Sequence, residues 1–106
     1  VSKGIAFPCC ISRNSCLCHN APTEMGEAID LGDLVKIELG AEVDGYPALV
    51  AHSFVVGATP AQPARGPAAN VIKAAHEAAE AALRLVRAGN RSDCLREPIS
   101  FIANNY

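Results

Sequence analysis

The clearest pattern in the chain is an alternation of apolar and polar residues over positions 35–40, which read Val-Lys-Ile-Glu-Leu-Gly. This period of two is typical of a half-buried β-strand. A second apolar run, rich in β-branched residues, follows over positions 48–56. Between the two runs, Asp44-Gly45 suits the two positive-φ positions of a type I′ turn. The pattern therefore predicts a β-hairpin.

The turn also predicts the register of this hairpin. A two-residue loop at Asp44-Gly45 pairs Val43 with Tyr46, so the numbers of paired residues sum to 89. Glu38 is then opposite Ala51, and Gly40 is opposite Leu49. Glu38 and Leu49 lie on one face as diagonal neighbours, roughly 7–8 Å apart. Two carboxylates there could share a pair of metal ions, but the chain offers one carboxylate and one leucine.

The segments before the hairpin predict short extended pieces. Residues 1–7 are a short apolar opening, and Pro8 is expected to interrupt any regular ladder. Residues 9–11 and 16–19 are expected to be extended, with a polar bend between them, and 24–30 is an acidic connector. Pro47 has no amide proton, so its strand is expected to be bulged or at a sheet edge.

The second half of the chain predicts one long helix over residues 67–88, after a linker rich in proline and glycine over residues 57–67. Its apolar stripe is Val71, Ile72, Ala75, Ala78, Ala79, Ala82, Leu85 and Val86. Pro67 suits the first turn, and Gly89-Asn90 is a stop signal. We expect this alanine-rich helix to pack on the sheet. Residues 93–97 are expected to form at most a helical turn that Pro98 breaks, with a strand or tail over 99–106.

Composition limits the class of protein. At 106 residues, 50% hydrophobic and 19% charged, the sequence describes one globular domain at most. The net charge of −2 gives no general affinity for nucleic acid or anionic membranes, and no apolar run approaches the roughly 18 residues of a membrane span. Because the sequence begins at Val1 inside an expected ordered segment, we interpret it as a fragment or a trimmed product.

The cysteines suggest a zinc site that their spacing does not favour. The chain has five cysteines, an odd number typical of a reducing compartment, and four of them precede His19 closely: Cys9, Cys10, Cys16 and Cys18. Structural zinc normally uses thiolates two to four residues apart, together with a second such pair. The only later cysteine is Cys94. We therefore favour buried, small, apolar cysteines over a metal site.

The three histidines have different expected environments. His19 follows an expected short strand and precedes a loop, where it either reaches a cleft or is partly buried and bonded to backbone. His52 alternates with apolar strand residues and is expected in the core. His76 lies on the helix and is expected to be solvated.

Several motifs together resemble one known family. They are Gly4-Ile-Ala-Phe-Pro8, Ile11-Ser12, Asn14, Cys16, Cys18-His19, Gly32-Asp-Leu-Val-Lys-Ile37, Asp44-Gly45, Val50-Ala-His-Ser-Phe-Val-Val56, Val71-Ile-Lys-Ala-Ala-His76, Ala79-Glu-Ala-Ala-Leu-Arg-Leu-Val86 and Gly89-Asn90. With these motifs the chain resembles the proliferation-associated, ErbB-receptor-binding relatives of type-two methionine aminopeptidase.

The resemblance implies an α/β (α+β) pita-bread fold, in which two related halves enclose a metal and substrate cleft. Residues 1–90 would form part of it, mainly the first half, and 91–106 a divergent C-terminal tail. In active aminopeptidases of this family, an aspartate ligand matches Glu38, a second matches Leu49, and the substrate-contacting histidine matches His19. The remaining ligands come from the later half, which this chain lacks. Glu38 and Leu49 are thus degenerate ligand positions, His19 is a vestigial cleft residue, and no metal or cofactor is expected, because leucine cannot coordinate a hard cation.

The function that the resemblance implies is binding without catalysis. The family's non-catalytic branch binds RNA and the large ribosomal subunit and influences growth and translation. We therefore expect a cytoplasmic pseudoenzyme, present also in the nucleus or nucleolus, whose partners are RNA, the large subunit or other proteins and not a membrane. The alternatives are a fragment of a working methionine aminopeptidase, and a structural half-domain that assembles with another chain.

Overall fold

The structure, a computed structural model, describes all 106 residues except Met25 and Glu27, so the acidic connector predicted over 24–30 lies partly outside the described residues. The chain forms two compact units, Val1–Pro63 and Ala64–Tyr106. The first is a sheet and the second is helical, which confirms the α+β class. None of the helices in the described part of the chain is both long and apolar enough to cross a membrane. The predicted boundary near residue 90 and the packing of the helix on the sheet stay predictions.

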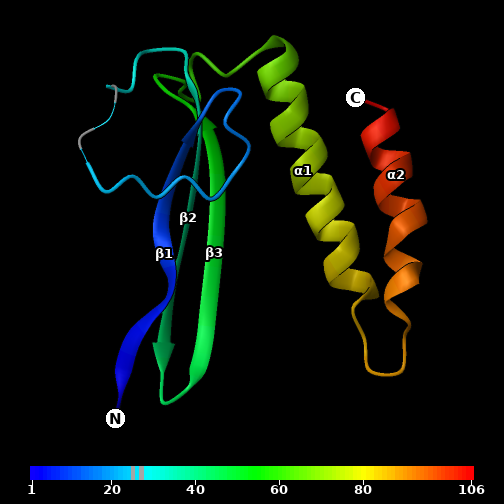
Figure 1. Cartoon of the computed structure of the whole chain (residues 1–106). Coiled ribbons are helices and arrows are strands. Elements are labelled where there is room, and N and C mark those ends of the chain that lie inside the picture. Colours follow the sequence, from blue (N-terminus) through cyan, green and yellow to red (C-terminus); the bar gives the residue numbers. More distant parts are fainter. Residues whose placement is uncertain (25, 27) are drawn as a thin grey trace. The chain divides into compact units, whose positions relative to one another are not determined.

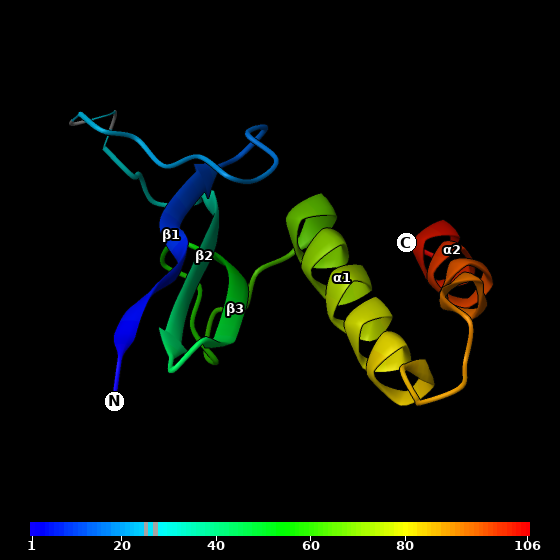
Figure 2. The ribbon, with the colours of Figure 1, turned by 60° about the horizontal axis from the view of Figure 1, so that its bottom comes forward.

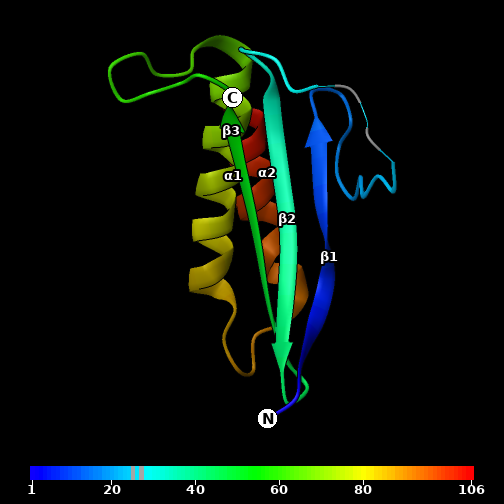
Figure 3. The same cartoon turned by 90° about the vertical axis from the view of Figure 1, so that its left-hand side faces the viewer.

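The first unit is a three-stranded antiparallel sheet in the order β1-β2-β3. The strands are β1 (Lys3–Arg13), β2 (Leu34–Val43) and β3 (Tyr46–Val55). Figure 1 labels them, and Figure 3 shows β2 between the other two. The predicted hairpin is confirmed: Asp44 and Gly45 have φ of 50° and 82°, and Val43 pairs with Tyr46. Pro47 lies on the edge strand β3, as its missing amide proton requires.

The first strand is longer than the sequence predicted. β1 continues through Pro8, and the ladder to β2 shifts register between Ile5 and Phe7 and again between Phe7 and Cys10. Pro8 therefore disturbs the pairing without ending the strand, because the irregularity absorbs its missing donor. The prediction of a second extended piece over 16–19 was wrong, since these residues belong to no strand and Cys18 lies in a bend.

The loop between β1 and β2 is joined at its two ends by Asn14 and Asp33. The Asn14 amide donates to Asp33 Oδ1 at 2.7 Å and accepts the Leu34 N–H at 2.9 Å. Asp33 Oδ2 also accepts the Asp30 N–H at 3.0 Å and lies 3.4 Å from Arg13 Nη1. The loop is therefore held at the end of the sheet where β1 ends and β2 begins (Figure 2).

The second unit consists of α1 (Gly66–Leu85), the 3₁₀ turn η1 (Ser92–Leu95) and α2 (Arg96–Asn104). The long helix is confirmed, with its end at Leu85 and Gly89 at a φ of 88° beyond it. The prediction for the end of the chain was wrong: Ile99 belongs to a helix and not to a strand or tail. Pro98 is the third residue of α2, in the first turn, where its missing N–H has no helical partner to lose.

We predict that Asp33→Asn lowers the melting temperature at neutral pH. The pKa of Asp33 lies below its ordinary value of 3.8, mainly because the Asp30 N–H and the Asn14 side chain donate to the carboxylate. A lowered pKa means that this contribution to stability is full above the unfolded-state pKa and is lost as the pH falls through the lower folded-state pKa. Thermal melts followed by circular dichroism should therefore differ at pH 7 and converge as the pH is lowered through the folded-state pKa of Asp33.

Asp93→Asn is the matched control, because Asp93 is an exposed aspartate whose salt bridge is to Arg91 at 3.0 Å. It should leave the melting temperature nearly unchanged, as exposed pairs contribute little. Equal melting temperatures for Asp33→Asn and the unmodified chain at pH 7 would contradict the assigned role of Asp33.

Candidate functional site

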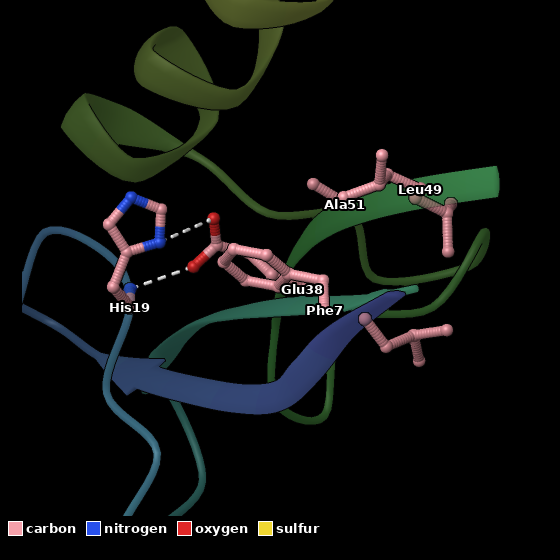
Figure 4. Close-up of a pocket in the computed structure, with 7 residues that line it drawn as sticks. Phe7, His19, Glu38, Leu49 and Ala51 are labelled. Atoms are coloured by element: carbon pink, nitrogen blue, oxygen red, sulfur yellow. Dashed lines mark hydrogen bonds and ion pairs between the residues drawn. The ribbon is translucent and has the colours of Figure 1, made fainter. Parts of the chain in front are cut away.

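The candidate site is a hollow of about 370 Å³ on the first unit. Its lining residues come from all three strands and from the loop between β1 and β2: Phe7, His19, Glu38, Leu39, Leu49, Val50 and Ala51. Glu38 pairs with Ala51 and Gly40 with Leu49, as the hairpin register predicted. Glu38, Leu49 and His19, the residues singled out from the sequence, therefore line one hollow (Figure 4).

Both carboxylate oxygens of Glu38 are engaged by His19. The His19 backbone N–H donates to Glu38 Oε2 at 2.7 Å, and His19 Nδ1 lies 3.2 Å from Oε1. Figure 4 shows the ring and the backbone of His19 approaching the same carboxylate. The Glu38 side chain is 19% exposed and that of His19 is 64% exposed. The carboxylate is thus a partly buried anchor for an exposed imidazole.

His19 reaches this position from a strained loop residue and not from the end of a strand. Its φ is 61°, in the left-handed region. For a residue other than glycine this conformation costs about 1–2 kcal/mol, so tertiary contacts must offset it. The left-handed backbone turns the N–H and the imidazole of the same residue toward Glu38. Of the two predicted environments, His19 adopts the one that reaches a cleft.

Sequence reasoning missed Phe7 as a residue of the site. Its ring lies 5.5 Å from the His19 ring at an interplanar angle of 59°. Phe7 pairs with Gly40 at the irregular part of β1, and a Cβ placed on Gly40 would lie only 3.0 Å from the Phe7 Cβ. A glycine within a strand often marks such a close approach, so Gly40 was the available signal.

The expectation of buried cysteines was right for one of the four that precede His19. Cys10 is buried, whereas Cys9, Cys16 and Cys18 are exposed. Burial raises the pKa of the Cys10 thiol, and the negative charge of the neighbouring Glu38 raises it further. Over residues 1–24, 26 and 28–106, no group of three or more histidine, cysteine, aspartate or glutamate side chains is placed to hold a metal ion.

The other two histidines are both exposed. The prediction of a core position for His52 was wrong: its ring lies 6.2 Å from the Phe54 ring on the same face of the edge strand β3. His52 does alternate with apolar residues along β3, but the face of the strand on which they lie is itself largely exposed. The prediction that His76 is solvated is confirmed.

Comparison with known proteins identifies the family of this fold. Residues 2–99 match the profile of metallopeptidase family M24. The chain belongs to metallopeptidase family M24. This assignment confirms the pita-bread fold class that the motifs implied, of which the sheet and two helices described here are an α+β part.

Some relatives of the chain are named as proliferation-associated or binding proteins, and others are named as enzymes. The chain is 43% identical to proliferation-associated protein A of Dictyostelium discoideum, an alignment that covers 100% of the chain and 28% of that protein. It is 41% identical to ErbB-3 binding protein 1 of Solanum tuberosum, over 100% of the chain and 27% of that protein. It is 36% identical to a methionine aminopeptidase of Archaeoglobus fulgidus, over 95% of the chain and 32% of that protein. The chain thus spans about a third or less of these relatives.

By themselves, the residues that line the hollow in the described part of the chain do not make the two-metal centre that the family name implies. A two-metal site needs several carboxylates to neutralise and bridge its ions. The hollow offers one carboxylate, and both of its oxygens already contact His19. Leu49 is 62% exposed and presents hydrocarbon, which cannot coordinate a hard cation, to the hollow.

We predict that Glu38→Asp releases the His19 segment although it keeps the charge. Aspartate is one methylene shorter, so it cannot reach both the N–H and the imidazole of His19, and the left-handed backbone loses its compensation. Hydrogen exchange at the His19 amide should become faster by about tenfold, corresponding to a loss of roughly 1.4 kcal/mol.

The matched control for this change is Glu80→Asp. Glu80 lies on α1 in the other unit and pairs with Arg84 at 3.1 Å, so shortening it should leave exchange at His19 unchanged. Unchanged protection of His19 in Glu38→Asp would show that the carboxylate does not hold this segment.

Proposed function

We propose that this chain belongs to a non-catalytic member of family M24, a degenerate peptidase fold used as a binding module. The observation that carries the proposal is the engagement of both Glu38 oxygens by His19, in a hollow that Leu49 lines with an apolar side chain. A carboxylate that holds a loop in place is not free to bridge two cations. A histidine that is tied to that carboxylate has no activated water to direct.

Glutamate at position 38 fits this structural role better than the aspartate of the active family members. Its extra methylene lets one side chain reach across the hollow to a backbone amide and a ring at once. Two divalent ions held about 3.5–4 Å apart repel strongly unless several carboxylates neutralise them. In this proposal the Glu38 carboxylate is engaged by His19 and position 49 is a leucine, so neither position supplies a free carboxylate for metal-dependent hydrolysis.

The binding role that we propose is association with the large ribosomal subunit or with RNA, in a regulator of growth and translation. It is supported by the resemblance to the proliferation-associated and ErbB-3-binding proteins, which are 41–43% identical to the chain. The charge of the chain adds little, because its net charge is −2 and its basic residues are sparse. The contacts with the ribosomal subunit or RNA would therefore depend on complementary shape and on a few basic side chains.

The runner-up function is metal-dependent methionine aminopeptidase activity. It is favoured by the 36% identity to the enzyme of Archaeoglobus fulgidus, and it is opposed by Leu49 and by the His19–Glu38 contact. The two functions make opposite predictions about metal binding.

We predict that the chain binds no manganese, cobalt or zinc with stoichiometric affinity in calorimetric titration, and that it does not cleave a methionyl peptide. Leu49→Asp alone should not restore turnover, because Glu38 would still be engaged by His19. Tight binding that Glu38→Ala abolishes, or chelator-sensitive turnover, would establish the enzyme alternative. Binding that Cys16→Ser or Cys18→Ser abolishes would instead indicate zinc held by thiolates.

We also predict that the tagged protein sediments with large ribosomal subunits and dissociates as salt rises from about 50 to about 200 mM, as expected where phosphate contacts contribute. Small ribosomal subunits replace the large subunits as a control for the partner. Serum albumin replaces the tagged protein as a control for non-specific sedimentation. A tagged protein that remains in the top fractions at the lowest salt, while large subunits pellet, would rule out this partner.

A further inference from the structure

Two of the free cysteines lie next to the contact between Glu38 and His19. Cys10 of β1 pairs with Glu38 of β2, and directly opposite residues of an antiparallel pair project to the same face of the sheet. Cys18 immediately precedes His19, whose N–H donates to Glu38 Oε2 at 2.7 Å. The sheet therefore presents one thiol beside the Glu38 side chain, and the loop carries another within one residue of its oxygens.

A second set of hydrogen bonds holds the loop alongside β1. The Ile11 N–H donates to the Asn20 C=O at 2.8 Å, and the Asn20 side chain donates to the Ile11 C=O at 2.8 Å. The Asn20 N–H also donates to Oγ of the buried Ser12 at 3.3 Å. The second residue after Cys18 is thus tied to the residue after Cys10, so the backbones of the two cysteines are held close together.

The two thiols differ in their access to solvent. Cys10 is 1% exposed, and its Sγ donates to the Pro8 C=O at 3.5 Å, whereas Cys18 is exposed. The pKa of the Cys10 thiol is raised by burial first and then by the charge of Glu38, and Cys18 also contributes, as expected for neighbouring thiols. A dissolved oxidant therefore meets Cys18 first, and Cys10 is the buried thiol beneath it.

The other two cysteines of this region are placed differently. The Cys16 N–H donates to the Arg13 C=O at 2.9 Å, at the end of β1. Arg13 is three residues beyond Cys10, which is about 10 Å along a strand. A disulfide joins Cα atoms that are at most about 7 Å apart. Cys9 lies where the ladder between β1 and β2 shifts register. The loop therefore offers Cys18, and not Cys16, to the sheet.

We propose that Cys10 and Cys18 are a modification site, at which hydrogen peroxide converts the two thiols to a disulfide that joins the loop to β1. The Cys18 sulfur attacks the peroxide, the O–O bond breaks, and a sulfenic acid and one water form. The Cys10 sulfur then attacks the sulfenic sulfur, and the S–O bond breaks as a second water leaves. Two electrons thus pass from the sulfurs to the peroxide, and two protons pass from the thiols to the waters.

The disulfide replaces a non-covalent restraint on the loop with a covalent one. In the reduced protein the left-handed backbone of His19 is held by the Glu38 carboxylate. In the oxidised protein Cys18, one residue away, is bonded to β1, so the loop stays in place without that carboxylate. In a reducing compartment such a disulfide is transient, and it reports exposure to the oxidant. Oxidation should therefore cancel the faster exchange at the His19 amide that we predict for Glu38→Asp.

The test is peptide mapping by mass spectrometry after the full-length protein is treated with hydrogen peroxide and its remaining thiols are alkylated. Trypsin cuts between the two cysteines of the site, so a disulfide joins two peptides that a reducing agent separates. Chymotrypsin cuts after Leu17, which separates Cys18 from Cys16. Fragmentation of the β1 peptide distinguishes Cys10 from Cys9. We expect one cross-link, between Cys10 and Cys18, in the unmodified sequence.

Serine variants provide matched controls. Cys10→Ser and Cys18→Ser should each abolish the cross-link, whereas Cys9→Ser and Cys16→Ser should keep it. The map of the unmodified protein decides the question even if Cys10→Ser, at a buried position, fails to fold. Absence of a cross-link, a cross-link between other cysteines, or one that forms only in denaturant would each overturn the proposal. None of these measurements involves a metal or a ribosome, so they are independent of the proposed function.

Discussion

The arrangement of the sheet depends on the Asp44-Gly45 turn. Both residues adopt positive φ, and the turn is reinforced by the Glu42 carboxylate, which accepts the Gly45 N–H at 2.9 Å. A strand that slipped by one residue would move every side chain to the opposite face. Glu38 would then leave the hollow, and the backbone groups of β3 that point away from β2 would turn toward it. One two-residue turn therefore determines the chemistry of the site and which backbone groups of β3 pair with β2.

The loop that carries His19 depends on a second constraint, the contact of Asn14 with Asp33. Because these residues lie at opposite ends of the β1–β2 loop, their 2.7 Å hydrogen bond shortens the distance that the loop must span. Asn14 itself has a φ of 47°, a conformation that asparagine tolerates better than most residues. The loop can then present His19 to Glu38 in a strained conformation. The loop thus contains two residues with positive φ, Asn14 and His19, and each contacts a carboxylate, Asp33 at the base of the loop and Glu38 in the sheet.

Much of this arrangement could be predicted from the sequence, because it depends on local chemistry. The Asp44-Gly45 turn determines the register that places Glu38 opposite Ala51, and helical periodicity locates α1. The remainder depends on contacts between distant segments. The left-handed backbone of His19 is maintained by Glu38, nineteen positions away. Phe7 enters the hollow because β1 changes register there, and no period-two pattern encodes such an irregularity. Pro98 was misread because a proline that ends one helix and a proline in the first turn of another look alike in sequence.

The hollow and the edge are physically linked through Leu49 and Ala51. Both residues line the hollow, and both belong to the odd-numbered residues of β3, whose backbone groups point away from β2. A strand that pairs with this edge therefore lies alongside the hollow, and its side chains on that face extend the lining.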